Sequence, residues 1–190
     1  EINLPETLAL YQAAQSNSSA DLLANQIVNE NNLTPHTNIK NYWTGEGYEL
    51  IKSDYERNYT FVETTVGPEN DVKIMRSSAI QACLNFYNKY KTNLNLIVQE
   101  DSIFYFDQDH DQNKVEEKDA YFMQVPLTYE LDGYPVFYEN NQEHPFICGV
   151  DNNYSLRKMI FKDFFYNFEE VGRMSPISNN QAISNIKKGL

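Results

Sequence analysis

The sequence predicts an α+β fold, in which an antiparallel β-sheet has helices packed on one face. Three observations lead to this fold class. One helix-start signature occurs three times, the segments between are rich in aromatic and β-branched residues, and tight turns connect those segments. A helix precedes strands twice, which indicates a helix-then-sheet unit repeated twice. We therefore expect residues 1–70 to form an N-terminal helix-plus-hairpin subdomain and residues 71–190 to form a C-terminal α+β domain.

Each predicted helix begins at a capping box, in which a hydroxyl side chain stands three residues before an acceptor side chain. The three boxes begin at Ser18, Ser78 and Ser178. The first helix is expected to end near residue 29. The second is expected to end near Tyr90, because its apolar residues recur at the i, i+3, i+4 and i+7 spacing of one helix face.

Strands are predicted wherever aromatic and β-branched residues run between polar turns. The first pair is a hairpin closed by the polar residues 54–58, and Asp132-Gly133 is a strong tight-turn signal in the second half. Residues 154–171 also fit helical spacing through their phenylalanines, but a strand with a bulge or with two buried faces is favoured. The predicted strands are residues 48–53, 59–66, 94–106, 120–131, 135–139, 146–150 and 154–171.

Composition argues against several classes of protein. Hydrophobic residues make up 41% of the chain and aromatic residues 14%, which excludes a wholly disordered chain. No apolar run in the sequence approaches the roughly 20 residues that span a bilayer. The formal net charge of -12 argues against duplex DNA or RNA as a partner, because phosphate binding needs clustered Lys and Arg.

The cysteines and histidines follow no recognised catalytic or metal-binding motif. Cys83 and Cys148 lack CxxC spacing and fall in apolar segments, so buried structural thiols are favoured over a disulfide. His36, His110 and His144 lie in three separate predicted loops without HExxH spacing, and we expect them at the surface. No nucleophile or phosphate-loop motif occurs either. The sequence therefore predicts no catalytic residue, no cofactor and no enzyme activity, with a hydrolase that leaves no motif as a third alternative.

An acidic stretch in the second half has the opening of a calcium loop. Asp107, Asp109 and Asp111 follow the DxDxD pattern, but Gln112 and Lys118 stand where such a loop requires Gly and Glu. A solvated hairpin tip is therefore favoured, and no metal is predicted. A weak calcium site formed by the three aspartates is the alternative.

Trp43 stands in a predicted glycine-flanked loop at residues 43–48, with Tyr42 and Tyr48 beside it. Aromatic faces stack on sugars or on protein partners, which makes these three residues the candidate binding surface. The simpler interpretation is that they fill half-buried sheet faces, where aromatic residues are preferred.

Three short motifs carry a resemblance to a known family. They are residues 4–11 (LPETLALY), residues 132–136 (DGYPV) and residues 175–178 (SPIS), the last leading into the third helix. Together they resemble the membrane-anchored YycH/YycI regulators of an essential histidine kinase in Gram-positive bacteria, and PepSY-like domains more broadly. This resemblance implies an α+β fold outside the membrane, an N-terminal anchor and a non-catalytic role in binding a partner. The acidic insert at residues 107–119 departs from the family pattern.

The resemblance leads us to expect a non-enzymatic extracytoplasmic module at the cell surface that regulates another protein, with a membrane-bound sensor as the candidate partner. Glu1 opens the chain without a Met or a leader, so we expect a processed chain whose membrane anchor or lipoprotein signal is out of view. The alternative is a cell-surface module that binds carbohydrate or wall polymer through Trp43 and its neighbouring tyrosines.

Overall fold

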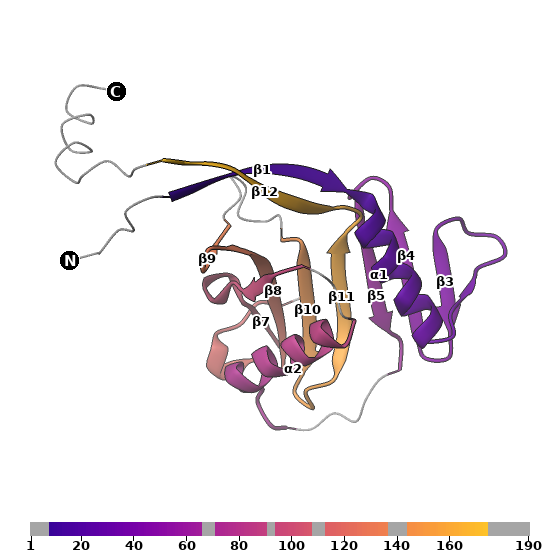
Figure 1. Cartoon of the computed structure of the whole chain (residues 1–190). Coiled ribbons are helices and arrows are strands. Elements are labelled where there is room, and N and C mark those ends of the chain that lie inside the picture. The colour runs from indigo at the N-terminus through magenta and orange to yellow at the C-terminus, as the bar shows by residue number, and fades with distance from the viewer. Residues whose placement is uncertain (1–7, 66–70, 91–93, 108–112, 137–143, 175–190) are drawn as a thin grey trace. The chain divides into compact units, whose positions relative to one another are not determined.

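The computed structural model describes residues 8–65, 71–90, 94–107, 113–136 and 144–174. This part of the chain is 47% strand and 23% helical. It divides into two compact units (Figure 1). The main unit spans residues 16–165, and the other is a ribbon in which β1 (Leu8–Ser16) pairs with β12 (Phe165–Met174).

The main unit is built on one antiparallel sheet of ten strands. Eight of them follow the order β2-β3-β4-β5-β11-β10-β8-β6, and β7 and β9 also pair with β8. Two short 3₁₀ turns, η1 (Glu100–Ser102) and η2 (Glu117–Asp119), connect strands in the second half. The strands are β2 (Thr34–Pro35), β3 (Tyr42–Gly45), β4 (Tyr48–Ser53), β5 (Asn58–Glu63), β6 (Leu96–Val98), β7 (Phe104–Phe106), β8 (Phe122–Leu131), β9 (Tyr134–Pro135), β10 (Phe146–Asp151) and β11 (Leu156–Lys162).

This architecture corrects the predicted fold class, an α+β fold built from a repeated helix-then-sheet unit. The described chain is predominantly β with two α-helices, and ten of its strands belong to one large sheet rather than to two units. The reason is the pairing of β5 with β11, which places Thr60 opposite Ile160. Because this pairing joins strands from both sides of residue 70, the second half of the chain extends the sheet of the first half. Residues 66–70, which precede the boundary predicted between residues 70 and 71, lie outside the described residues.

The two described helices are α1 (Asn17–Glu30) and α2 (Arg76–Lys89). Their positions agree with the apolar spacing, but the predicted capping boxes are wrong, since neither helix has a side-chain cap bond. α2 already contains Arg76 ahead of Ser78. Burial of the apolar stripe against the sheet therefore fixes each helix more than its first turn does. The third predicted helix, near Ser178, lies outside the described residues.

Strands with local turn signals were predicted correctly. The β4–β5 hairpin is confirmed, and so is the tight turn at Asp132-Gly133 between β8 and β9, whose two residues have φ of 52° and 81°. Positive φ at both positions suits a two-residue hairpin turn. The segment 154–171 is strand rather than helix, but the prediction of one bulged or doubly buried strand is wrong. It forms two strands, β11 in the main sheet and β12 in the ribbon. The sequence patterns do not indicate β1, β2 or β3.

The core lies on the face of the sheet against which α2 packs. Directly opposed residues form a row across five strands, and none of the five is more than 3% exposed. The row consists of Leu50, Phe61, Met159, Cys148 and Val125. Since side chains alternate along a strand, the next row, which includes Ile51, Thr60 and Ile160, faces the other side and is partly exposed.

Candidate functional site

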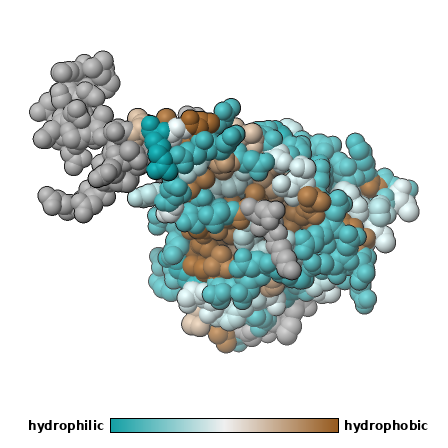
Figure 2. All heavy atoms as spheres, viewed as in Figure 1, coloured by the Kyte–Doolittle hydropathy of each residue, from teal (hydrophilic) through white to brown (hydrophobic). Residues whose placement is uncertain are grey.

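The β1–β12 ribbon is a two-stranded sheet, with no third strand among the described residues. It carries three of the ten large hydrophobic side chains that are exposed in the described chain: Leu10 is 43%, Val171 58% and Met174 48% exposed. Hydrophobic and hydrophilic residues lie side by side on its surface (Figure 2). A two-stranded sheet alone is at best marginally stable in water. The ribbon therefore combines exposed apolar side chains with two strands that have no further strand beside them among the described residues.

The two strands of the ribbon differ in charge. β1, with the sequence LALYQAAQS, has no charged residue in its nine positions. β12 contains Glu169, Glu170 and Arg173, and Arg173 donates to both carboxylate oxygens of Glu170 at 2.8 and 3.2 Å. Edge strands of folded proteins are normally protected by charges, Pro or bulges. Because β1 has neither charge nor Pro, the ribbon is the candidate interaction site of the described chain.

Two of the sequence-predicted binding residues lie on the core face of the main sheet, and Trp43 belongs to strand β3 rather than to the predicted loop. Trp43 is opposite the fully buried Leu50 in the β3–β4 register. The ring of Tyr48 stacks on Phe61, with ring centroids 5.4 Å apart. Both aromatic side chains are half-buried and extend the core face toward the edge of the sheet.

Tyr42, the third predicted binding residue, is turned to the opposite face. It pairs with Ile51, and a hydrogen bond to Glu49 raises the pKa of its hydroxyl. The ring of His36 lies 5.2 Å from that of Tyr42. The register therefore separates Tyr42 from Trp43, which favours the interpretation that these aromatic side chains fill the two faces of the sheet.

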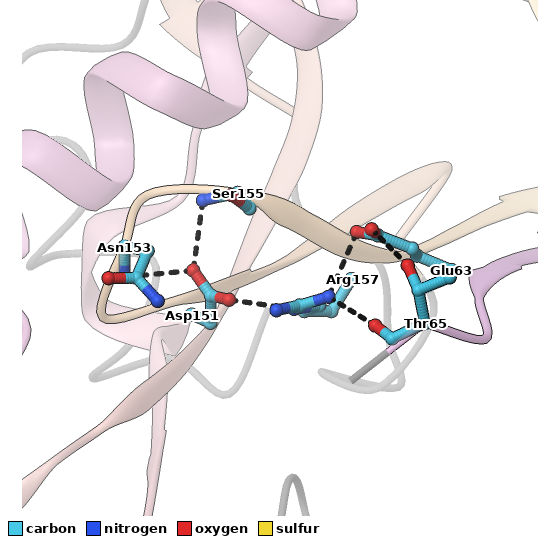
Figure 3. A network of polar contacts seen from close by, with 6 residues as sticks. All are labelled: Glu63, Thr65, Asp151, Asn153, Ser155 and Arg157. Atoms are coloured by element: carbon cyan, nitrogen blue, oxygen red, sulfur yellow. Dashed lines mark hydrogen bonds and ion pairs between the residues drawn. The ribbon is translucent and has the colours of Figure 1, made fainter. Parts of the chain in front are cut away.

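A charged network closes the β10–β11 hairpin (Figure 3). One carboxylate oxygen of Asp151 accepts the backbone N–H groups of Asn153 and Ser155, each at 2.9 Å. The other oxygen accepts Nε–H of Arg157 at 2.7 Å. Both oxygens of this buried carboxylate are thus committed to holding the turn.

The same guanidinium reaches across to the end of β5. Nη1 of Arg157 donates to the Thr65 carbonyl at 2.6 Å and lies 3.1 Å from a carboxylate oxygen of Glu63 (Figure 3). The network therefore ties the β10–β11 turn to the neighbouring strand. Its geometry is that of a structural clamp, in which each charged group has a fixed partner.

His144 is buried, which corrects the prediction of a surface loop. It is only 7% exposed, and within the described part of the chain neither ring nitrogen has a hydrogen-bond partner. The reason is the residue that follows: the Pro145 carbonyl accepts the N–H of Lys162 at 3.1 Å, which places His144 at the end of the β10–β11 pairing. Burial, and then the charge of Lys162, lowers the pKa of His144. His36 is half-buried, and His110 lies outside the described residues.

Cys83 and Cys148 are free and fully buried, in agreement with the predicted structural thiols. The Cys148 thiol donates to the Cys83 carbonyl at 3.7 Å, and the Cys83 thiol donates to the Val125 carbonyl at 3.9 Å. Burial, and then the contact with Cys83, raises the pKa of Cys148. The two thiols therefore belong to the packing of α2 on the sheet.

Of the candidate calcium ligands, Asp107 is described, whereas Asp109 and Asp111 lie outside the described residues. Within the described ranges, no three His, Cys, Asp or Glu side chains are grouped so that they would hold a metal ion. In that same part of the chain, no helix combines the length and the apolar character needed to cross a bilayer.

Neither a protein-family model, nor a curated protein, nor a solved structure matches this chain. The ribbon and the motifs of the sequence are therefore the features that bear on function.

Proposed function

We propose that the chain is a non-enzymatic, extracytoplasmic regulatory module that binds another protein through the β1–β12 ribbon. The observation that carries this proposal is the ribbon itself, a two-stranded sheet with Leu10, Val171 and Met174 exposed. A protein partner suits both of its features. An added strand bonds to the open backbone edge, and its side chains cover the apolar ones.

β12 is the strand that we assign to a partner of different sequence. Its charged residues Glu169, Glu170 and Arg173 are interspersed with apolar ones such as Val171. Apolar contact supplies affinity, while charges at the rim of an interface set partner choice and orientation. Because the whole chain carries a net charge of -12, we expect the facing surface of the partner to be basic.

The regulatory role and the extracytoplasmic location rest on the resemblance of the sequence motifs, with a membrane-bound sensor as the proposed partner. The non-enzymatic character is supported by the way charged and nucleophilic groups are used. Asp151 and Arg157 are committed to the hairpin clamp, and no carboxylate of the described residues is bonded to the buried ring of His144. The thiols of Cys83 and Cys148 are fully buried.

Photo-crosslinking in the producing cell tests the proposal. A photoreactive amino acid in place of Val171 should crosslink the chain to one protein, which mass spectrometry identifies. The matched control carries the same amino acid in place of Val72, which is 64% exposed but belongs to the main unit. The control should not give that product.

The affinity of the purified partner then tests the surface. Val171→Glu should weaken binding by at least about 10-fold, which corresponds to about 1.4 kcal/mol, because the interface would bury a carboxylate. Val72→Glu should leave the affinity within about 2-fold, a change below about 0.5 kcal/mol. Val171→Thr keeps a β-branched strand residue and should bind far better than Val171→Glu. Equal affinities for Val171→Glu and Val72→Glu would contradict the proposal.

A further inference from the structure

We propose that β1 pairs with β1 of a second copy of the chain, so that two ribbons form one four-stranded sheet in the order β12-β1-β1-β12. This inference rests on the proposed function, because it assigns the second edge of the same ribbon. β12 would be left for the partner of different sequence, and β1 would join the two copies.

The chemistry of β1 favours a second copy over a charged partner. All nine residues of the strand are uncharged, and Pro and Gly are absent from it. Two such edges can pair without placing like charges opposite each other and without leaving a charge unpaired. A charged strand from a different protein could not form an ion pair with this uncharged edge.

Self-pairing of β1 also matches side chains by size. Gln12 is the midpoint of Leu8–Ser16, so a two-fold axis at Gln12 gives full overlap of two antiparallel strands. Leu10 then stands opposite Ala14 of the second copy, and Tyr11 stands opposite Ala13. Each large side chain meets a small one, and the two Gln12 amides meet on the axis, where each can donate to and accept from the other.

The energetics of small sheets point the same way. A two-stranded sheet is marginal in water, whereas three or more strands with an apolar face gain independent stability. Pairing at β1 takes the ribbon from two strands to four and covers part of Leu10, which is 43% exposed. Two chains with a net charge of -12 each repel, so association should strengthen as salt screens that repulsion.

Analytical ultracentrifugation of the full chain with charge-swapped variants tests the proposal. The wild-type chain should dimerise in a concentration-dependent way, with a dissociation constant below about 100 µM in 0.15 M salt. Gln12→Glu and Gln12→Lys should each weaken self-association by at least about 10-fold, because like charges then face each other on the axis. An equimolar mixture of the two variants should recover a heterodimer, which a variant that merely disrupts the ribbon would not do.

The matched controls are Gln81→Glu and Gln81→Lys, which make the same changes at an exposed position of α2. They should leave the dissociation constant of the wild type unchanged. A wild-type chain that stays monomeric at about 100 µM would overturn the β1 pairing. So would a dimer insensitive to Gln12, an equal effect at Gln81, or a mixture that does not recover the dimer.

The two proposals fail in different ways. A monomeric chain whose partner binding is still weakened by Val171→Glu would remove the β1 pairing and leave the proposed function standing. A dimer that depends on Gln12, together with partner binding that is unchanged in Val171→Glu, would remove the proposed function and leave the β1 pairing standing.

Discussion

Arg157 donates a 2.7 Å hydrogen bond from Nε to a carboxylate oxygen of Asp151, and the two side chains are only 13% and 5% exposed. The same carboxylate accepts the backbone N–H groups of Asn153 and Ser155. The ion pair and the β10–β11 turn therefore hold each other in place. The charge of Arg157 compensates for the burial of Asp151, and the turn N–H groups satisfy its second oxygen.

Removing one member of this pair should destabilise the main unit. Arg157→Ala leaves the Asp151 carboxylate buried without its charged partner, so the free energy of unfolding should fall by about 2–4 kcal/mol. Urea denaturation followed by the fluorescence of Trp43 measures the loss. The double variant Asp151→Ala/Arg157→Ala should lose less than the sum of the single variants, with a coupling energy of about 1–3 kcal/mol. Strictly additive losses would show that the two side chains do not support each other.

Gly149 should not tolerate even a methyl group. A Cβ at this position would lie 2.5 Å from the ring of Phe122 and 3.1 Å from Cβ of Lys158. Gly149→Ala should therefore cost about 1–3 kcal/mol of stability through overpacking. Gly172→Ala is the matched control, because a Cβ there meets nothing within 4 Å. Phe122→Leu should restore part of the loss in Gly149→Ala, and equal stabilities of the two Gly→Ala variants would contradict this account.

The sequence predicts elements whose signals are local. The β4–β5 hairpin and the Asp132-Gly133 turn are specified by a few adjacent residues, and both are present. β1 is a different case, because Ala9, Ala13 and Ala14 favour a helix rather than a strand. Its partner strand is also distant: the Gln15 side-chain amide donates to the Tyr166 hydroxyl at 3.3 Å, across 151 positions of sequence. Pairing over such a separation leaves no pattern in either segment.

The positions of the sequence-predicted binding residues and of His144 could not be predicted for the same reason, because strand pairing sets them. Tyr42 and Trp43 are neighbours in sequence, but strand alternation sends them to opposite faces. The sequence around His144 predicts a surface loop. The hydrogen bond between Pro145 and Lys162 places the residue in the interior instead. The available signal for the ribbon was the absence of charge in β1, which becomes informative only once that segment is known to be an edge strand.

The stability of the main unit should fall below neutral pH because of His144. Its folded pKa lies below the unfolded value of about 6.5, mainly through burial. The unfolded chain therefore binds the proton first as the pH falls. The contribution of His144 is fully present above about pH 6.5 and is lost as the pH falls through that value toward the folded pKa.

Urea titrations at about pH 7.5 and about pH 5.5 measure this effect, since these values bracket the unfolded pKa. His144→Leu should lose less stability than the wild type between the two conditions, because the buried site no longer titrates. Lys162→Met should also reduce the pH dependence, because the charge of Lys162 helps to lower the pKa of His144. The same pH dependence in His144→Leu and in the wild type would contradict the assignment.

Cys83 and Cys148 should be unreactive in the folded chain and fully reactive once it unfolds. Both thiols are fully buried, so a thiol reagent cannot reach them. Burial also raises the pKa of Cys148, which disfavours the reactive thiolate there. Alkylation at about pH 8 should therefore add no label to the native chain and two labels in denaturant without reductant, as counted by intact mass. Cys148→Ser should destabilise the main unit more than Cys148→Ala. Serine brings a hydroxyl that must be desolvated in the buried site beside the Cys83 carbonyl, whereas alanine brings no polar atom. A denatured chain that takes up label only after reduction would instead reveal a disulfide between α2 and β10, and rapid labelling of the native chain would show that the helix opens from the sheet.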